Sequence, residues 1–553
     1  MASRPSIQAP LEFIPPRFNR WVNWLSYATL PITLRLRLRP WLPAGIEQVN
    51  VHNTQTLVQL FHQFQANKIR LLIAFRHVEV EDPLCMGYMF SHTVPQVARQ
   101  LDIPLRQPLH SHFMYDRGMS LWAGQWLKGF FADLGGVPVR RGRRLDLKAI
   151  KSARQLLVNG RFPLTIAPEG ATNGHGEMLS PLEPGVAQMA FWGVQDLRQQ
   201  QRLEDMIVLP VSVRYYYPCP NWERLEQLLQ GLEVDCGLVN QTQGQGHTAA
   251  PASASPQFFS RNGDRSGVTQ SSVTQSSVTR SSVTQSSVTQ SSVTQSSVAQ
   301  SSVAQSSEAQ PSAALRNFYY QRLLRIGIQM LSITTQVYRQ FYNAPLPEPL
   351  QLAEIMEQLD LNATGQNEAI AHHLTPLLDE ILKISERYFG IPSTGNLPSR
   401  CRKLEEAGWN RIYRDDIADV RSLSPMEKGF GDRIAAESDL YMGHMRLVES
   451  LVAVSGHYVK DKPSFERFAE TALILFDVME RIKGVAVPCR PRLGWRQSHI
   501  TIGTPIAITE RWDDYKQGRK AAKKAMDSLT EEVRAQLETL MQTDPSNVSS
   551  IGH

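Results

Sequence analysis

The chain has 553 residues, of which 42% are hydrophobic, and this is enough for a substantial core and for two or three domains. Its five cysteines are odd in number and widely scattered, which argues against a disulfide scaffold or a zinc site and favours an intracellular protein with reduced thiols. The formal net charge of +6 suits anionic lipid or acidic carrier surfaces; no nucleic-acid-binding module accompanies it, so we expect no nucleic-acid partner.

Residues 1–49 form a basic, amphipathic N-terminal segment. Its apolar run from Trp21 to Leu34 is too short to span a bilayer and lies between arginines (Arg17, Arg20, Arg35, Arg37 and Arg39). Arginines also occupy the place where a secretory signal would carry its small-residue cleavage site. Aromatic residues within such a strip favour the membrane interface, so we predict peripheral attachment on the cytoplasmic side of a membrane. The alternative is a helix packed on its own domain.

Within the domain predicted for residues 50–235, a strand-like run from Leu71 to Phe75 leads into RHVEVED, where four residues separate His77 from Asp82. An imidazole titrates near neutrality, and a carboxylate that accepts its second N–H fixes the tautomer and stabilises the imidazolium. The motif contains no Ser or Cys nucleophile, so His77 is predicted to activate a hydroxyl brought by a substrate. The alternative is a satisfied core histidine, with Asp82 as a loop cap.

Further motifs follow in chain order. Trp122, Trp126 and Phe130 recur at i, i+4 and i+8, which predicts a helix whose aromatic face is either core or a membrane-side surface. Three more segments come next: LGGVPVRR at 134–141, APEGATNGHGEMLSPLEPGVAQMA at 167–190, and IVLPVSVRY at 207–215.

Together with RHVEVED, these segments resemble the four ordered blocks of the glycerolipid acyltransferase family, typified by lysophosphatidic acid acyltransferases. The resemblance implies that His77 and Asp82 are catalytic. It also implies that the second and third blocks bind a glycerophosphate acceptor and that a hydrophobic strand closes the site, which assigns these roles to Gly135, Arg141, Pro168, Glu169, Gly170 and Pro210. No metal and no bound cofactor are expected, because acyl-CoA or acyl carrier protein serves as co-substrate.

The third block departs from the family pattern. Ala167 stands where family members carry an aromatic residue, Ala171 and Thr172 where they carry Thr and Arg, and Glu183 and Pro184 replace a stretch that often contains Lys. The site has therefore lost cations that would favour a phosphate dianion. This leaves glycerol 3-phosphate or a neutral hydroxylated lipid as alternative acceptors.

Arg140 and Arg141 still provide guanidinium groups suited to phosphate, and Arg76 is a further candidate cation. The alternative for the arginines of this loop is a solvated surface. Glu169 is either a direct acceptor contact or a structural carboxylate that accepts backbone N–H groups of its own loop.

The chain changes character after this domain. Residues 236–312 are polar, with tandem Val-Thr-Gln-Ser-Ser pentads from Val268, and predict a disordered linker. Residues 313–494 show helical periodicity over 317–342, 350–359, 370–388, 425–458 and 464–482 and predict a helical insert, a candidate surface for a protein partner. Its Glu437, His444, Glu449 and His457 are not spaced as metal ligands.

Residues 495–542 contain an alternating strand and an amphipathic helix, and we expect them to return to the first domain and complete it, followed by a tail at 543–553. The alternative is two consecutive domains. The predicted fold class is α/β, with a mostly parallel central sheet flanked by helices and strands at 70–75, 137–139, 163–166, 207–213 and 500–502.

The function that the resemblance implies is transfer of a fatty acyl group from a thioester to a glycerolipid hydroxyl in phospholipid biosynthesis, most simply from lysophosphatidate to phosphatidate. A membrane-bound scaffold that keeps the fold without turnover is the alternative from another class.

Overall fold

The computed structural model of the chain describes residues 5–39, 42, 44–140, 146–238, 312–350, 363–452, 456–485 and 487–542. Several sequence-based predictions concern residues outside these ranges: Arg141, the tandem pentads, nearly all of the helix expected at 350–359, and the tail at 543–553.

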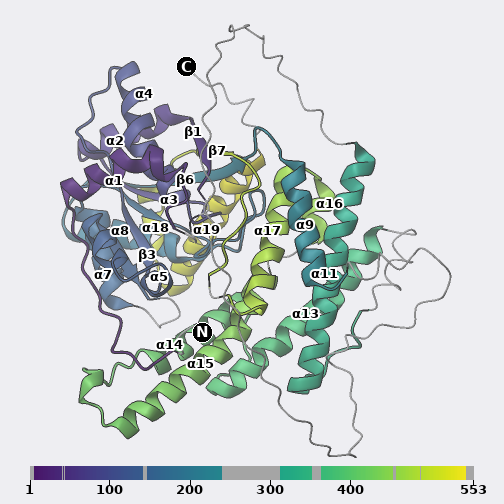
Figure 1. Cartoon of the computed structure of the whole chain (residues 1–553). Coiled ribbons are helices and arrows are strands. Elements are labelled where there is room, and N and C mark those ends of the chain that lie inside the picture. Colours follow the sequence, from purple (N-terminus) through teal and green to yellow (C-terminus); the bar gives the residue numbers. More distant parts are fainter. Residues whose placement is uncertain are drawn as a thin grey trace, which may run out of the picture. The chain divides into compact units, whose positions relative to one another are not determined.

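A mixed, mostly parallel sheet of eight strands lies at the centre of the α/β domain, in the order β1-β7-β6-β2-β5-β3-β4, with β8 also paired to β6 (Figure 1). From β6 to β4 all neighbours are parallel, whereas β7 and β8 run antiparallel to β6. The predicted fold class is confirmed. The strands are β1 (Ile46–His52), β2 (Ile69–Phe75), β3 (His112–Asp116), β4 (Gly136–Val139), β5 (Leu164–Ile166), β6 (Asp205–Tyr216), β7 (Arg496–Ile502) and β8 (Ile506–Ala507).

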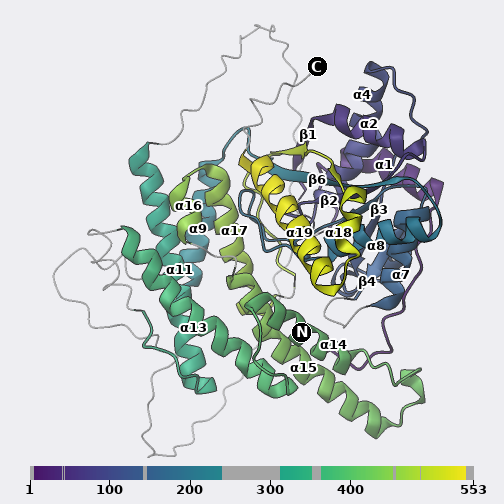
Figure 2. The ribbon, with the colours of Figure 1, turned by 180° about the vertical axis from the view of Figure 1, so that it is seen from behind.

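Helices cover both faces of this sheet, because alternate residues of its inner strands point to opposite sides. In β2, Leu71 and Ile73 pack toward α2 (Thr54–Gln65), α3 (Asp82–Tyr88) and α4 (Val94–Gln100). Leu72 and Ala74 pack toward α7 (Leu147–Asn159), α8 (Gly185–Gln199) and α19 (Arg519–Gln542), and Figure 2 shows α19 in front of the sheet.

Strand β7 follows the helical region in sequence and lies between β1 and β6 in the sheet. β1 and β3 have no counterpart among the predicted strands. β1 buries only its first residue fully, and β3 does the same, so neither carries the clear apolar alternation of a half-buried strand.

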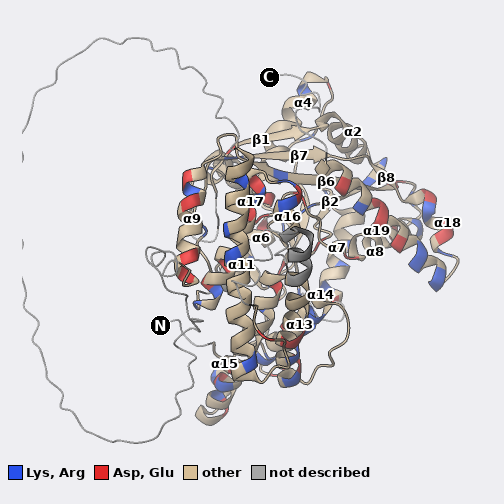
Figure 3. Ribbon diagram, turned by 90° about the vertical axis from the view of Figure 1, so that its right-hand side faces the viewer, with Lys and Arg blue, Asp and Glu red and all other residues tan. Residues whose placement is uncertain are grey.

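The helical region has its own core, built from α9 (Trp222–Asp235), α11 (Ala313–Tyr342), α13 (Ala363–Phe389), α14 (Leu397–Ile412), α15 (Pro425–Leu451), α16 (Gly456–Asp461) and α17 (Phe465–Ile482). Figure 3 shows acidic positions along α9 beside basic positions on α11. Arg322 of α11 pairs with both Glu226 and Glu233 of α9, with Nε 2.7 Å from Glu233 Oε1. Trp222 stacks on Tyr319 at 5.1 Å, so the two helices run side by side.

Two predicted helices differ from the observed ones. The helix expected at 425–458 ends at Leu451, and His457 belongs to α16. His444 donates to or accepts from the Tyr338 hydroxyl at 2.6 Å, and burial lowers its pKa to about 4. Over the described part of the chain, no cluster of three or more His, Cys, Asp or Glu is arranged to hold a metal ion.

The aromatic stretch around Trp126 is interrupted: α5 (Met119–Trp122) and α6 (Leu127–Asp133) are separate helices. Gly124 between them has a φ of +120°, and a Cβ there would lie 2.8 Å from the Trp126 indole nitrogen. A glycine in this conformation breaks the helix that the i, i+4, i+8 spacing predicts.

Helix α1 (Arg20–Thr33) carries a mostly exposed apolar side. Trp21 and Trp24 are 78% and 63% exposed, whereas Leu30 is buried. Within the described ranges, none of the helices combines the length and the hydropathy needed to cross a bilayer.

Candidate active site

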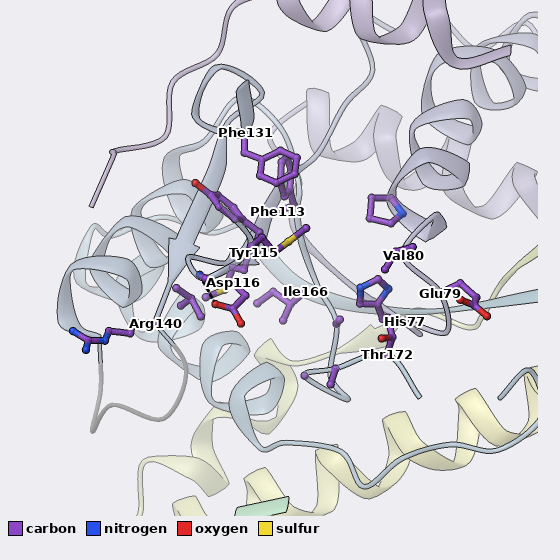
Figure 4. A pocket seen from close by; sticks show the side chains of 18 of the residues that line it. His77, Glu79, Val80, Phe113, Tyr115, Asp116, Phe131, Arg140, Ile166 and Thr172 are labelled. Carbon is purple, nitrogen blue, oxygen red and sulfur yellow. Dashed lines mark hydrogen bonds between the residues drawn. The ribbon is translucent and has the colours of Figure 1, made fainter. Parts of the chain in front are cut away.

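His77 lies two positions after the end of β2, a strand whose seven residues are all buried. The Arg76 amide still bonds to the Val211 carbonyl at 2.8 Å, and then the chain turns away from the sheet. His77 therefore stands at the carboxyl end of a central parallel strand, where α/β folds gather their functional groups. Its side chain is 22% exposed and lines a cavity (Figure 4).

Asp82 is fully buried at the start of α3, and both of its carboxylate oxygens are occupied. Oδ2 lies 3.0 Å from His77 Nδ1 and accepts the amides of Val78 at 2.6 Å and Glu79 at 3.0 Å. Oδ1 accepts the Tyr215 hydroxyl. Burial raises the pKa of Tyr215 well above its ordinary value, so this hydroxyl stays protonated and stays the donor.

This arrangement fixes the function of the two imidazole nitrogens. Because Asp82 accepts at Nδ1, the neutral ring carries its proton there, and Nε2 keeps the free lone pair of a base. The carboxylate also stabilises the imidazolium that would form when Nε2 takes up a proton. The structure thus brings together the two residues that the sequence pairs.

Two charged side chains hold the loop that faces His77. Arg76 is fully buried and donates to the carbonyls of His175, Gly176 and Met178, while burial lowers its pKa. Because its guanidinium is occupied inside the loop, Arg76 does not offer a cation to the cavity surface.

Glu169 is 3% exposed, and burial raises its pKa. Its Oε1 accepts the His77 amide at 3.2 Å, and its Oε2 accepts the Ser180 amide at 2.9 Å and the Asn173 side chain at 3.1 Å. In the structure Glu169 therefore has the contacts of a structural carboxylate that pins its own loop to the catalytic segment.

The residues of the predicted second block lie in two places. Gly135 is buried at a turn with φ +77°, where a Cβ would lie 2.6 Å from His112 Nδ1, and it does not line the cavity. Arg140 lines the cavity at the end of β4, but its Nη2 donates to Asn410 of α14 at 2.6 Å. Arg141 lies outside the described residues.

Of the remaining predicted residues, only Gly170 lines the cavity. Pro168 is buried and its carbonyl accepts the Glu183 amide at 2.8 Å, which closes the loop on itself. Pro210 is buried within β6, opposite Ala74 of β2, so it belongs to the sheet behind the site.

The cavity has a volume of about 2520 Å³. Its apolar part lies between α1, α3 and β3, and Figure 4 shows Phe113, Tyr115 and Phe131 grouped on one side with His77 facing them. Arg140 and Asp116 also line it. The volume exceeds the roughly 300–1,000 Å³ of an ordinary ligand pocket, so it has room for a long acyl chain together with a second substrate.

The helical region forms another wall of the same cavity, through α14, α15, α17 and the segment after α17. Examples are Arg402, Trp409 and Met442. These side chains follow His77 by more than 300 positions in the chain, and no local pattern in the sequence marks them as neighbours of the site.

Two arginines after α17 hold the catalytic segment from outside. Arg490 Nη1 lies 3.0 Å from Glu79 Oε1, and Arg496 of β7 pairs with Glu81. Burial raises the pKa of Glu81 to about 7, although Arg496 opposes this shift. The loop that carries His77 and Asp82 is therefore held by two arginines that lie more than 400 positions further along the chain.

The domain around this site has a known counterpart in sequence. Residues 48–214 match the family model described as Acyltransferase, and this range contains His77, Asp82 and every other predicted site residue. No curated protein and no solved structure shows a significant match to the chain. The matched model is that of the glycerolipid acyltransferases. The match therefore supports acyl transfer to a glycerolipid-type substrate as the general activity of the domain. The chain accordingly contains, in residues 48–214, a domain of the glycerolipid acyltransferase family.

Proposed function

We propose that this protein transfers a fatty acyl group from a thioester, acyl-CoA or acyl carrier protein, to a hydroxyl of a glycerolipid precursor. Lysophosphatidate is the first acceptor to consider, with phosphatidate as product. The observation that supports the proposal is the His77–Asp82 pair, 3.0 Å apart, with the imidazole on the wall of a cavity large enough for two lipid substrates.

The proposed reaction is a direct displacement. His77 Nε2 removes the proton of the acceptor hydroxyl as its oxygen attacks the thioester carbonyl, and Asp82 stabilises the imidazolium. The new bond joins this oxygen to the acyl carbon, and the carbon–sulfur bond breaks. The imidazolium then returns its proton to the departing thiolate, which leaves the enzyme in its starting state. The thioester is consumed as a co-substrate, and the proposal requires no resident cofactor or metal.

The acceptor is open between two classes. Arg140 and Arg141 favour a phosphate-bearing acceptor. Ala171 and Thr172 supply no cation on the loop next to His77. This favours a neutral hydroxylated lipid over glycerol 3-phosphate, because a neutral lipid carries no phosphate to neutralise. Both remain acyl transfer to a glycerol-type hydroxyl.

We also propose that the protein works at the surface of a membrane, on its cytoplasmic side. Helix α1 exposes Trp21, Trp24 and Leu25, and its residues Ser26 and Leu30 line the cavity. Indole rings between arginines suit the interface of an anionic bilayer. A lipid acceptor would then enter the cavity alongside the helix that contacts the membrane.

The test of the reaction compares the parent protein with His77→Ala on labelled acyl-CoA and acyl carrier protein, using lysophosphatidate, glycerol 3-phosphate and monoacylglycerol as acceptors. We expect His77→Ala to lower kcat by roughly 10²- to 10⁴-fold, the usual contribution of a general base. His62→Ala is the matched control, since His62 is exposed on α2 and away from the cavity. Equal turnover by the parent and His77→Ala would refute the mechanism.

A further inference from the structure

Helix α14 of the helical region contacts both loops to which acceptor binding was assigned. Near its start, Arg402 pairs with Glu183, which lies in the third block. Near its end, Asn410 accepts a hydrogen bond from Arg140, which belongs to the second block. All of these except Asn410 line the cavity that also contains His77. One helix of the insert therefore lines the reaction cavity and contacts both loops.

Arg402 approaches the Gly170 loop closely. A Cβ at Gly170, whose φ is +72°, would lie 3.8 Å from Arg402 Nη2 and would collide with Glu183 Oε1. Gly170, Ala171 and Thr172 line the cavity without a charged side chain of their own. Arg402 thus brings a guanidinium group close to the Gly170 loop, which lines the same cavity as His77.

The pairing of Arg402 leaves it able to exchange partners. Its side chain and that of Glu183 are each 39% exposed, and an ion pair exposed to this degree contributes little net stability. A guanidinium has five N–H donors in a planar fork, so it can bind a phosphate with one edge while Glu183 keeps another. By comparison, Arg490 is held by both Glu79 and Asp477.

On the basis of the function proposed above, we propose that Arg402 of the insert is an acceptor-binding residue that recognises the phosphate of a lysophospholipid-type acceptor, and that Glu183 restrains it. The insert then determines acceptor choice, because it supplies a cation that the acyltransferase domain lacks at its third block. The bonds that change in the reaction remain those at His77.

The experiment measures KM for lysophosphatidate and for monoacylglycerol of the same chain length, in the full-length parent and in Arg402→Gln, Arg402→Lys and Glu183→Gln. A lost charge-assisted hydrogen bond corresponds to roughly 10- to 150-fold in affinity. We expect Arg402→Gln to raise KM for lysophosphatidate about tenfold or more and to leave KM for monoacylglycerol and for the acyl thioester unchanged. Arg402→Lys should restore part of the loss.

Glu183→Gln distinguishes a binding role of Arg402 from a structural one, because it should change KM for lysophosphatidate in the direction opposite to Arg402→Gln. Freed from its carboxylate, Arg402 should bind lysophosphatidate more tightly, and KM should fall a few-fold. If the pair only stabilised the fold, both variants would lower the melting temperature and impair both acceptors alike, and that result would overturn the proposal.

Lys403→Gln is the matched control. It removes a positive charge from the adjacent position of α14, but the Lys403 ammonium bonds to the Thr394 carbonyl at 2.7 Å, and the side chain does not line the cavity. We expect its KM values to equal those of the parent.

Binding without turnover keeps this inference separate from the proposed reaction. Lysophosphatidate in mixed micelles is titrated into His77→Ala and into the His77→Ala, Arg402→Gln double variant. Weaker binding by the double variant supports the role of Arg402, whether or not the parent shows acyl transfer. If the parent shows no transfer, the proposed reaction is refuted while the binding role of Arg402 stands. Equal binding by the two proteins, or a parent that acylates monoacylglycerol and ignores lysophosphatidate, refutes the role of Arg402.

Discussion

Asp82 has more partners than a side chain that only orients an imidazole needs. Besides the ring, it accepts two backbone amides of the segment between itself and His77, and it accepts the hydroxyl of Tyr215 from β6. The same carboxylate therefore fixes the conformation of the loop and the orientation of the His77 ring. A change at this residue has to be judged by both activity and folding.

The substitution Asp82→Asn tests this residue. The amide keeps the size of the side chain but carries no charge and offers one acceptor oxygen instead of two, so the imidazolium loses its stabilisation. We expect kcat to fall by roughly 10²-fold or more, within the range for loss of general-base catalysis. Acyl transfer at saturating acceptor measures the effect. Unchanged kcat in a protein that melts like the parent would contradict the assigned role.

At the residue scale, the local part of the site was predictable and the distant part was not. His77 and Asp82 stand five positions apart, so a short motif carries them. Glu169 was assigned two possible roles, and its bonds to the amides of His77 and Ser180 are those of the structural one. Arg402 and Arg490 reach the site only through folding of the helical region, which no spacing in the sequence expresses.

At the scale of elements, the turn between α6 and β4 depends on Gly135. Its φ of +77° is unfavourable for any residue with a Cβ, and a Cβ there would meet the His112 ring. We expect Gly135→Ala to lower the free energy of unfolding by about 1–3 kcal/mol. Gly185→Ala is the control, since Gly185 begins α8 and a Cβ there meets nothing within 4 Å. Denaturant titration should show a neutral or slightly stabilised control; similar losses in both variants would contradict this account of the turn.

Helix α17 carries a carboxyl group that titrates in an unusual range. Glu470 accepts the Tyr458 hydroxyl at 2.5 Å, and burial raises its pKa from 4.5 to about 8. Between these two pH values the folded protein retains a proton that the unfolded chain has lost, so the free energy of unfolding falls as the pH rises. The stability linked to this group is therefore present below about pH 4.5 and lost by about pH 8.

Glu470→Gln removes this titration and keeps a neutral hydrogen-bonding group. We expect the variant to gain stability relative to the parent as the pH rises from 5 to 8, measured by denaturant unfolding at pH 5, 6.5 and 8. Glu510→Gln, at an exposed position, provides the baseline. A difference between Glu470→Gln and the parent that does not change with pH would show that the carboxyl group is ionised throughout.

Elements with a strong pattern were predicted well, and elements with a weak one were not. β2 and β6 are apolar runs within the sheet core, and α11 and α17 repeat apolar residues at helical spacing, so each overlaps its prediction. α14 is rich in charged residues and had no predicted counterpart, although it borders the cavity. It packs against α15, where Met442 lies against Gly408 of α14.

At the scale of the whole molecule, the two helices that flank residues 239–311 run in the same direction. Trp222 at the start of α9 stacks on Tyr319, and Gln329, ten residues further along α11, reaches the Cys236 carbonyl at the end of α9. The chain must therefore return from the end of α9 to the start of α11, a distance of about 24 Å for the 16 residues from 313 to 329.

This geometry sets a minimum length for the connection. Deleting residues 244–306 leaves about ten residues, which reach roughly 33 Å when extended, so we expect parent-like melting and acyl transfer. Deleting residues 239–311 leaves nothing to cover the distance, and α9 should lose its pairing with Arg322. Circular dichroism melting and the transfer assay compare the two. Full activity in the longer deletion would contradict the parallel packing, and loss of activity in a folded shorter deletion would show that the removed residues do more than connect.

The pairing of β1 with β7 imposes a delay on biosynthesis. β1 leaves the ribosome about 450 residues before β7, which at 5–20 residues per second means roughly 20 to 90 seconds. During that time β1 has no neighbour, and the β6 edge that later binds β7 is an unpaired, apolar strand. The helical region is made and can fold within the same interval. We therefore expect the apolar edge of β6 to be exposed in the nascent chain until β7 has been made, unless the helical region or a chaperone covers it.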